Sequence, residues 1–338
     1  MTRGRRSMLA IFRLFLGLFV VVAVVVALVR SWDDVAPYLS ELSAQGVGAA
    51  LLLALLAPYF TMLGWRTMLT DLGSPLPLAP AASVFFVGQL GKYVPGSIWA
   101  VLAQAEMGSR LGVPRRRVGV TGLLAIAFAL LTGGAIGLPA LPVLLGRTEI
   151  GAYAVVAVVV ILAVACYPPL LNWGITRGLR LLRRQPLEHD LAGRALVTTL
   201  AWFTLAWSVS GLTVLMLALD ISGATLDGSL LLTCVCGFAL ASAFGMVSVF
   251  FPAGFGVRDG VLALILATSM PFAAAVAVAV VSRFLTIAVD VLVAGAGWMW
   301  GRGHDLLDDD LEALAVPVPD VDGPDVDGPD VDGPEAPR

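Results

Sequence analysis

The hydrophobic positions of this chain form long runs that are separated by short polar connections. Apolar runs cover residues 14–29, 47–69, 118–138, 152–171, 195–219, 229–250 and 271–300. Because about 20 apolar residues span a bilayer as a helix, each run predicts a transmembrane segment. Broken or short apolar segments cover residues 81–111 and 261–268. The pattern therefore predicts an all-α integral membrane protein, a polytopic bundle of about seven or eight transmembrane helices.

Glycine, proline and a cation interrupt the apolar pattern in two places. One segment reads Gly88-Gln-Leu-Gly-Lys-Tyr-Val-Pro-Gly-Ser97, and the other reads Phe251-Pro-Ala-Gly-Phe-Gly-Val-Arg-Asp-Gly260. Glycine and proline disfavour a regular helix, and irregular backbone at membrane depth persists only where protein or a water-filled cavity covers it. Paired breaks point to a binding site. We expect unwound backbone at Gly88, Gly91, Pro95, Gly96, Pro252, Gly254 and Gly256.

The distribution of arginine predicts how the first broken segment sits in the membrane. If the segment enters from the cytoplasm and returns, fourteen arginines lie on the cytoplasmic side and two outside; if it crosses, six lie inside and ten basic residues outside. The positive-inside rule favours the first arrangement. We therefore expect two re-entrant elements, Lys92 near the tip of the first, and a cytoplasmic N-terminus. The same count does not decide the side of the C-terminus, for which we expect the cytoplasm.

Composition divides the chain into three parts. The chain is 59% hydrophobic and only 13% charged, whereas soluble domains carry about 25% charged residues. Residues 1–13 form a basic cytoplasmic N-terminus, 14–300 the transmembrane domain, and 301–338 an acidic tail with three copies of Asp-Val-Asp-Gly-Pro. Like charges with repeated proline and glycine cannot bury a core, which predicts a disordered tail.

Five charged residues lie within apolar segments: Lys92, Arg258, Asp259, Arg283 and Asp290. An unpaired charge costs about 2.5–3.5 kcal/mol at the centre of a span, so these residues must be paired, hydrated or close to an interface. One interpretation pairs the arginines with the aspartates as an assembly device. The other is a cationic cavity that binds a phosphate or carboxylate, helped by exposed N–H groups and helix N-termini. For Lys92 the second is favoured, because no acid lies near it before Glu106.

Cysteine and histidine do not indicate a metal or catalytic centre. Cys166, Cys234 and Cys236 lie in apolar runs and are interpreted as packing residues, and His189 and His304 lie in polar connections. We expect no metal, no cofactor and no enzymatic activity, since a nucleophile–base constellation is missing. The basic triplet 115–117 and the loop 177–194 set the topology or bind anionic lipid at the surface.

The two broken segments resemble the signatures of the lysylphosphatidylglycerol synthase transmembrane region, also called the flippase-like domain family. The matching stretches are Gly91-Lys-Tyr-Val-Pro-Gly-Ser-Ile-Trp99 and Pro252-Ala-Gly-Phe-Gly-Val-Arg-Asp259, and Arg283 falls where the family carries an arginine. The resemblance, over roughly residues 10–300, implies about eight helices with two re-entrant elements lining a lipid-accessible cavity. The best-studied members move an aminoacylated phospholipid between leaflets. Here Ala253 and Asp259 replace the usual glycine and glutamate, and no soluble aminoacyl-transfer domain follows Trp300.

Residues and resemblance together predict a multi-pass protein of the plasma membrane that binds and translocates a lipid or lipid-linked glycan with an anionic headgroup. Lys92, Arg258 and Arg283 would hold the phosphate, and Asp259 and Asp290 would balance them or contact a cationic part of the substrate. The alternative is a non-transporting subunit or scaffold that recruits a partner enzyme of envelope lipid or glycan synthesis. We expect no nucleic-acid ligand, and the oligomeric state stays open.

Overall fold

The computed structural model describes residues 32–94, 98–141, 153, 156, 160, 167–181, 183–248 and 254–304, and its elements in these ranges are helices. Five are long and apolar enough to cross a membrane: α3 (Ala44–Asp71), α6 (Arg115–Gly137, continued by the 3-10 turn η2, Leu138–Ala140), α10 (Gly193–Ser222), α11 (Gly228–Val247) and α13 (Phe272–Arg302). The chain is thus a multi-pass α-helical membrane protein. The expected span 14–29, most of 152–171, the N-terminus 1–13 and most of the tail lie outside the described residues.

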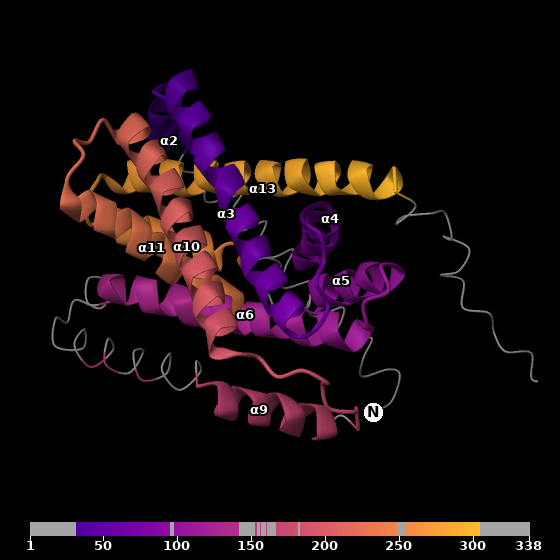
Figure 1. Ribbon diagram of the computed structural model, residues 1–338. Helices are drawn as coiled ribbons and strands as arrows, with labels where there is room; N and C mark the ends of the chain where they lie inside the picture. The colour runs from indigo at the N-terminus through magenta and orange to yellow at the C-terminus, as the bar shows by residue number, and fades with distance from the viewer. Residues whose placement is uncertain are drawn as a thin grey trace, which may run out of the picture.

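Two of the long helices, α3 and α10, lie side by side, and α13 crosses them (Figure 1). Close packing is possible because Gly64 of α3 faces the Phe203 ring of α10, and Thr199 Oγ1 of α10 donates a 3.4 Å hydrogen bond to the Gly64 carbonyl. Small residues at such contacts are the usual basis of helix association in lipid, where apolar burial alone gives no preference for a protein neighbour.

In the described residues, the first broken segment contains two short helices and a 3-10 turn. These are α4 (Leu78–Gln89) with the 3-10 turn η1 (Leu90–Tyr93), and α5 (Trp99–Arg110). Each α-helix has 12 residues, about 18 Å at 1.5 Å per residue, against a hydrocarbon core of about 30 Å. The two ends of the segment meet: Arg117, after α5, donates hydrogen bonds to the Gly73 carbonyl (2.8 Å) and Ser74 Oγ (2.9 Å), before α4.

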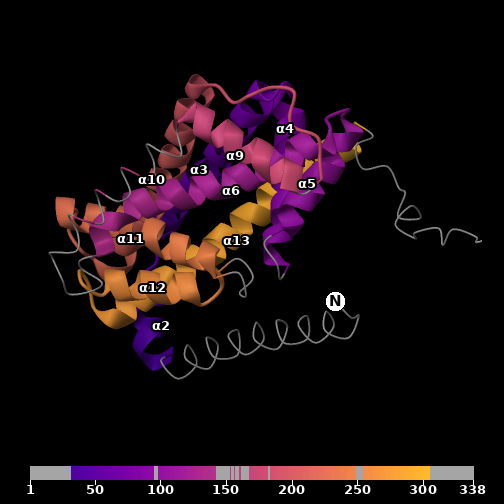
Figure 2. The same cartoon turned by 90° about the horizontal axis from the view of Figure 1, so that it is seen from below.

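The second broken segment connects α11 to the short helix α12 (Val257–Leu266). Near this turn, a Cβ on Gly254 would lie 2.6 Å from the Cα of Gly245. At the other end of α12, Ser269 donates a 3.3 Å hydrogen bond to Thr233 Oγ1, near the start of α11. The chain therefore returns along α11 before α13 begins, and Figure 2 shows α12 at the beginning of α13, with α4 and α5 towards its other end.

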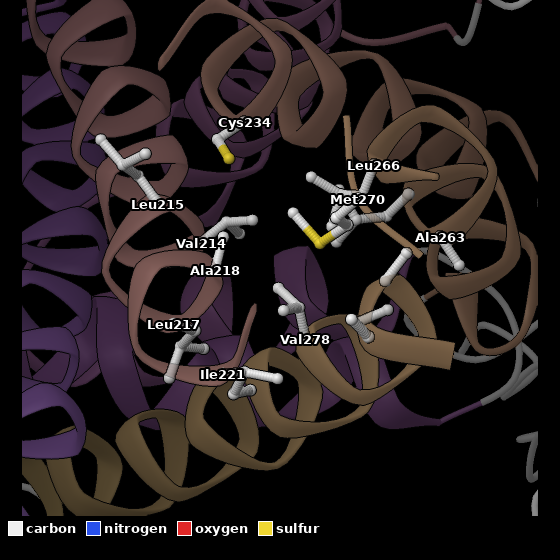
Figure 3. Close-up of a cluster of buried hydrophobic side chains, with 14 of the residues drawn as sticks. Val214, Leu215, Leu217, Ala218, Ile221, Cys234, Ala263, Leu266, Met270 and Val278 are labelled. Atoms are coloured by element: carbon white, nitrogen blue, oxygen red, sulfur yellow. The ribbon is translucent and has the colours of Figure 1, made fainter. Parts of the chain in front are cut away.

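An apolar cluster joins α10, α11, α12 and α13. Side chains from these helices converge in Figure 3, with Cys234, Met270 and Val278 around its centre. Cys234 and Cys236 are buried free thiols, which confirms the packing interpretation for these two residues. Cys166 lies outside the described residues.

Two stretches expected to be connections are partly helical. Residues 32–45 contain α2 (Trp32–Ser40), where Tyr38 and Leu39 pack against the apolar cluster. The basic stretch 177–194 begins inside α9 (Pro168–Leu181), because Leu171, Ile175 and Leu179 recur at a spacing of four and face the protein. In both cases tertiary contacts stabilise a helix that the polar composition did not indicate.

Candidate functional site

Arg283 and Asp290 lie in the middle of α13. Arg283 follows the first residue of this 31-residue helix by eleven positions, and Asp290 precedes its last by twelve. Their exposed fractions are 6% and 7%. A spacing of seven residues is close to two helical turns, so both side chains project from the same face into the protein, as the sequence predicts.

Lys92 and Tyr93 bring the first broken segment to Asp290. Lys92 Nζ lies 2.8 Å from Asp290 Oδ2, and the Tyr93 hydroxyl donates a 2.5 Å hydrogen bond to the same oxygen. No acid lies near Lys92 along the sequence, but the fold supplies one. Its partner comes from α13, whereas Glu106, the nearest acid in sequence, pairs with Arg115 at 2.7 Å.

Glycine allows the backbone of the first segment to turn beneath α5. A Cβ at Gly91 would lie 2.5 Å from the backbone nitrogen of Ala100, and one at Gly88 would lie 2.4 Å from Cγ of Gln104. The α-helix stops at Gln89 and tightens into η1, which carries Lys92 in its last turn. The expected departure from the α-helix is found at Gly91, in η1, but the expectation for Gly88 is wrong, because Gly88 lies within α4, which continues to Gln89. Pro95 and Gly96 lie outside the described residues.

Positive φ angles shape the start of α12. Gly254 and Gly256 have φ of +66° and +80°, a region that glycine enters without steric cost. The Asp259 carboxylate then accepts a 3.2 Å hydrogen bond from the Gly256 N–H and satisfies one of the donors left open at a helix N-terminus. Pro252, the remaining expected residue of this turn, lies outside the described residues.

Arg258 is buried next to Asp259. Its side chain is 10% exposed, and its Nε lies 3.5 Å from Asp259 Oδ1. Its Cζ lies 5.0 Å from the centroid of the Phe238 ring, a cation–π contact. Within the described ranges, neither Nε nor Nη2 of Arg258 has a hydrogen-bond partner. The guanidinium is thus held by the charge of Asp259 and by the face of the Phe238 ring. Its Nε and Nη2 are left available to donate hydrogen bonds to a ligand.

The two broken segments meet around Arg283. Its Cζ lies 5.1 Å from the centroid of the Phe255 ring, which belongs to the second segment. Tyr93 of the first segment lies within electrostatic range of Arg283 and Arg258 as well as of its hydrogen-bonded aspartate. All five charged residues expected from the sequence therefore form one cluster: Lys92, Arg258, Asp259, Arg283 and Asp290.

The cluster carries a net positive charge and opens at Lys92. Three cationic side chains accompany two carboxylates, a formal charge of +1. The Lys92 side chain is 34% exposed, against 9% for Asp290 and 15% for Asp259. An anion approaching from solvent would meet the ammonium group first.

Three aromatic residues of the cluster were missed by the sequence reasoning. Tyr93 bonds to Asp290, and Phe255 and Phe238 lie under the two guanidinium groups. Tyr93 and Phe255 lie within the two broken segments, so their positions in the sequence could have indicated that they belong to the cluster. Phe238 is one apolar residue within an apolar helix, and nothing in its local sequence distinguishes it.

The basic residues near the ends of the spans are engaged in structural contacts. Arg117 pairs with Glu188 in the loop that follows α9, and Arg116 Nη1 donates a 2.9 Å hydrogen bond to the Gln185 carbonyl. A surface cavity of about 490 Å³ lies along α9, lined by Trp173, Arg180 and other residues of that helix and its neighbouring loop. None of its lining residues belongs to the charged cluster.

Comparison with protein families matches residues 14–294 to the family described as Lysylphosphatidylglycerol synthase TM region. The matched range includes both broken segments and the whole charged cluster. A search of curated proteins finds no match at the required significance.

Proposed function

The chain belongs to the lysylphosphatidylglycerol synthase TM region family, and from that premise we propose that it binds, and moves between leaflets, a lipid or lipid-linked substrate with an anionic headgroup. Family membership concerns the flippase-like membrane region rather than a catalytic part, so the proposed role is transport without chemistry on the substrate. The substrate would bind at the charged cluster, with its phosphate on Lys92, Arg258 and Arg283.

The observation that carries the proposal is a partly exposed ammonium group in the same cluster as a buried arginine whose Nε and Nη2 lack hydrogen-bond partners among the described residues. Phosphate oxygens accept several hydrogen bonds at once and suit such a site. Burying five charges would be costly without a role, because a buried ion pair is often no more stable than well-packed apolar residues. Asp259 and Asp290 would hold the cations in place until a headgroup arrives.

We further propose that both broken segments are re-entrant elements whose tips meet inside the membrane. The second half of α13 packs along α4, where the Ser83 hydroxyl donates a 2.8 Å hydrogen bond to the Gly297 carbonyl. The first half packs along α12, so the tips meet at the middle of α13. Positive-inside reasoning then assigns the α4–α5 side, the N-terminus and the end of α13 to the cytoplasm of a plasma-membrane protein. The expected spans 14–29 and 152–171 together with α3, α6, α10 and α13 would then cross the membrane six times, an even number that leaves both ends on the same side, while α11 and α12 form the second re-entrant element.

Translocation of a fluorescent phospholipid in proteoliposomes tests the proposed role. Lys92→Ala should abolish translocation, because the headgroup loses the most accessible cation of the site. Arg115→Ala is a matched control: it removes a cation whose side chain is 65% exposed and pairs at the surface, and it should leave transport unchanged. Equal transport by Lys92→Ala and wild type, at equal reconstitution, would refute the proposal.

Chemical protection gives an independent test, because Lys92 is the only lysine in the sequence. An amine-reactive reagent followed by peptide mass analysis therefore reports on this side chain alone, apart from the N-terminal amine. Phosphatidylglycerol should slow modification of Lys92 in the purified protein. Phosphatidylcholine with the same acyl chains is the control lipid for detergent and packing effects. Equal modification rates with and without phosphatidylglycerol would argue against headgroup binding at Lys92.

A further inference from the structure

The number of charges in the cluster limits which headgroup it can neutralise. The described residues supply three cations and two carboxylates, and Arg258 lies 3.5 Å from Asp259 and within electrostatic range of Asp290 and Arg283. Residues 95–97 and 249–253 contain no ionisable side chain, so they add nothing to the formal charge of +1. Charge left uncompensated in a low-dielectric site is costly.

Neither carboxylate is free to leave the cluster. Asp290 accepts from both Lys92 and the Tyr93 hydroxyl, and its side chain is 9% exposed. Asp259 is bound to the Gly256 N–H at the start of α12 and lies beside Arg258. A headgroup consequently meets the sum of the five charges, not three unopposed cations.

Building on the proposed function, we propose that the site selects a monoanionic phosphodiester headgroup. One negative charge brings the cluster to neutrality, and the groups that would receive it are the exposed Lys92 and the open Nε and Nη2 donors of Arg258. A dianionic phosphomonoester or a diphosphate would leave an excess of negative charge. A zwitterionic headgroup would leave the positive charge in place. A lysyl ester of phosphatidylglycerol carries two ammonium groups and one phosphate, so it would add to the positive charge of the cluster.

Lipid competition on the purified full chain tests this selectivity. Native mass spectrometry at neutral pH measures retention from an equimolar mixture of dioleoyl phosphatidylglycerol, phosphatidylethanolamine and lysyl-phosphatidylglycerol, and a separate mixture compares phosphatidylglycerol with phosphatidic acid at a pH where the latter is a dianion. Wild type should retain phosphatidylglycerol about tenfold over the other three. A unit charge within several ångströms changes binding by about this factor or more at the effective dielectric of a protein.

Variants that change the charge of the site provide the decisive comparison. Asp259→Asn makes the site more positive with almost no change in shape and should shift the preference towards phosphatidic acid by about tenfold. Arg258→Gln makes it neutral and should shift the preference towards phosphatidylethanolamine. Arg115→Gln removes a positive charge at the surface, outside the cluster, and should keep the wild-type order of lipids. If Arg258→Gln does not fold, Lys92→Gln makes the same change of charge at a more exposed position.

The outcomes separate this proposal from the proposed function. Wild type that retains phosphatidylglycerol and phosphatidylethanolamine equally, or an Asp259→Asn variant with the wild-type order, would overturn the charge-matching selectivity while lipid binding stands. Wild type that retains no lipid, together with unprotected Lys92, would overturn the proposed function and the selectivity with it.

Discussion

The ion pair between Lys92 and Asp290 predicts unequal costs when either partner is removed. Lys92→Met leaves a carboxylate whose side chain is 9% exposed and whose remaining hydrogen bond comes from Tyr93. Asp290→Asn leaves an ammonium group on a side chain that is 34% exposed and can take up water. The new asparagine can still accept from the Tyr93 hydroxyl. The lysine substitution should therefore cost more stability than the aspartate substitution.

The structure sets the magnitudes of these costs. Leaving one charge of a buried pair without its partner costs about 3–5 kcal/mol, whereas exposed pairs contribute about 0–1 kcal/mol. The burial of Asp290 places Lys92→Met near the lower end of the first range, at about 3 kcal/mol. The exposure of Lys92 places Asp290→Asn at about 1–2 kcal/mol. The double variant removes both charges and should cost less than Lys92→Met alone.

Reversible unfolding by SDS from mild detergent, followed by tryptophan fluorescence, measures these free energies. Wild type, the two single variants and the double variant form a double-mutant cycle, which isolates the coupling between the two side chains. Coupling of about 1–2 kcal/mol is expected. The reasoning would be refuted if Asp290→Asn cost as much as Lys92→Met, or if the two costs were additive.

Three further substitutions test the geometry around the site. Gly91→Ala places a methyl group against the backbone of Ala100, where a Cβ would lie 2.5 Å from its nitrogen, and should cost about 2 kcal/mol or more in the same unfolding assay; an unchanged midpoint would show that η1 and α5 do not touch at Gly91. Tyr93→Phe keeps the ring and removes one hydrogen bond to a carboxylate, and should cost about 1–3 kcal/mol. Glu188→Gln removes the ion pair to Arg117 and should speed limited proteolysis between α9 and α10 by several-fold, with little change in lipid binding; an unchanged cleavage rate would show that this ion pair does not hold the loop.

Much of the architecture could be predicted because membrane insertion is a local property of the chain. The apolar runs at 47–69, 118–138, 195–219, 229–250 and 271–300 correspond to the five long helices, with ends that differ by a few residues. Glycine and proline marked both irregular turns, because few other residues permit such backbone. The helices α2 and α9 were missed, since their stability comes from packing against the bundle rather than from their own composition.

The sequence by itself determined that the chain is a membrane bundle with two broken segments and five charges that need an explanation. A bilayer is a nearly uniform solvent, so the cost of each residue in it can be read one position at a time. Only the tertiary structure decided that Asp290 pairs with Lys92, that Phe238 and Phe255 hold the arginines, and that both turns meet at the middle of α13. These contacts join residues far apart along the chain, and their energies depend on distances that only the packing of whole helices sets.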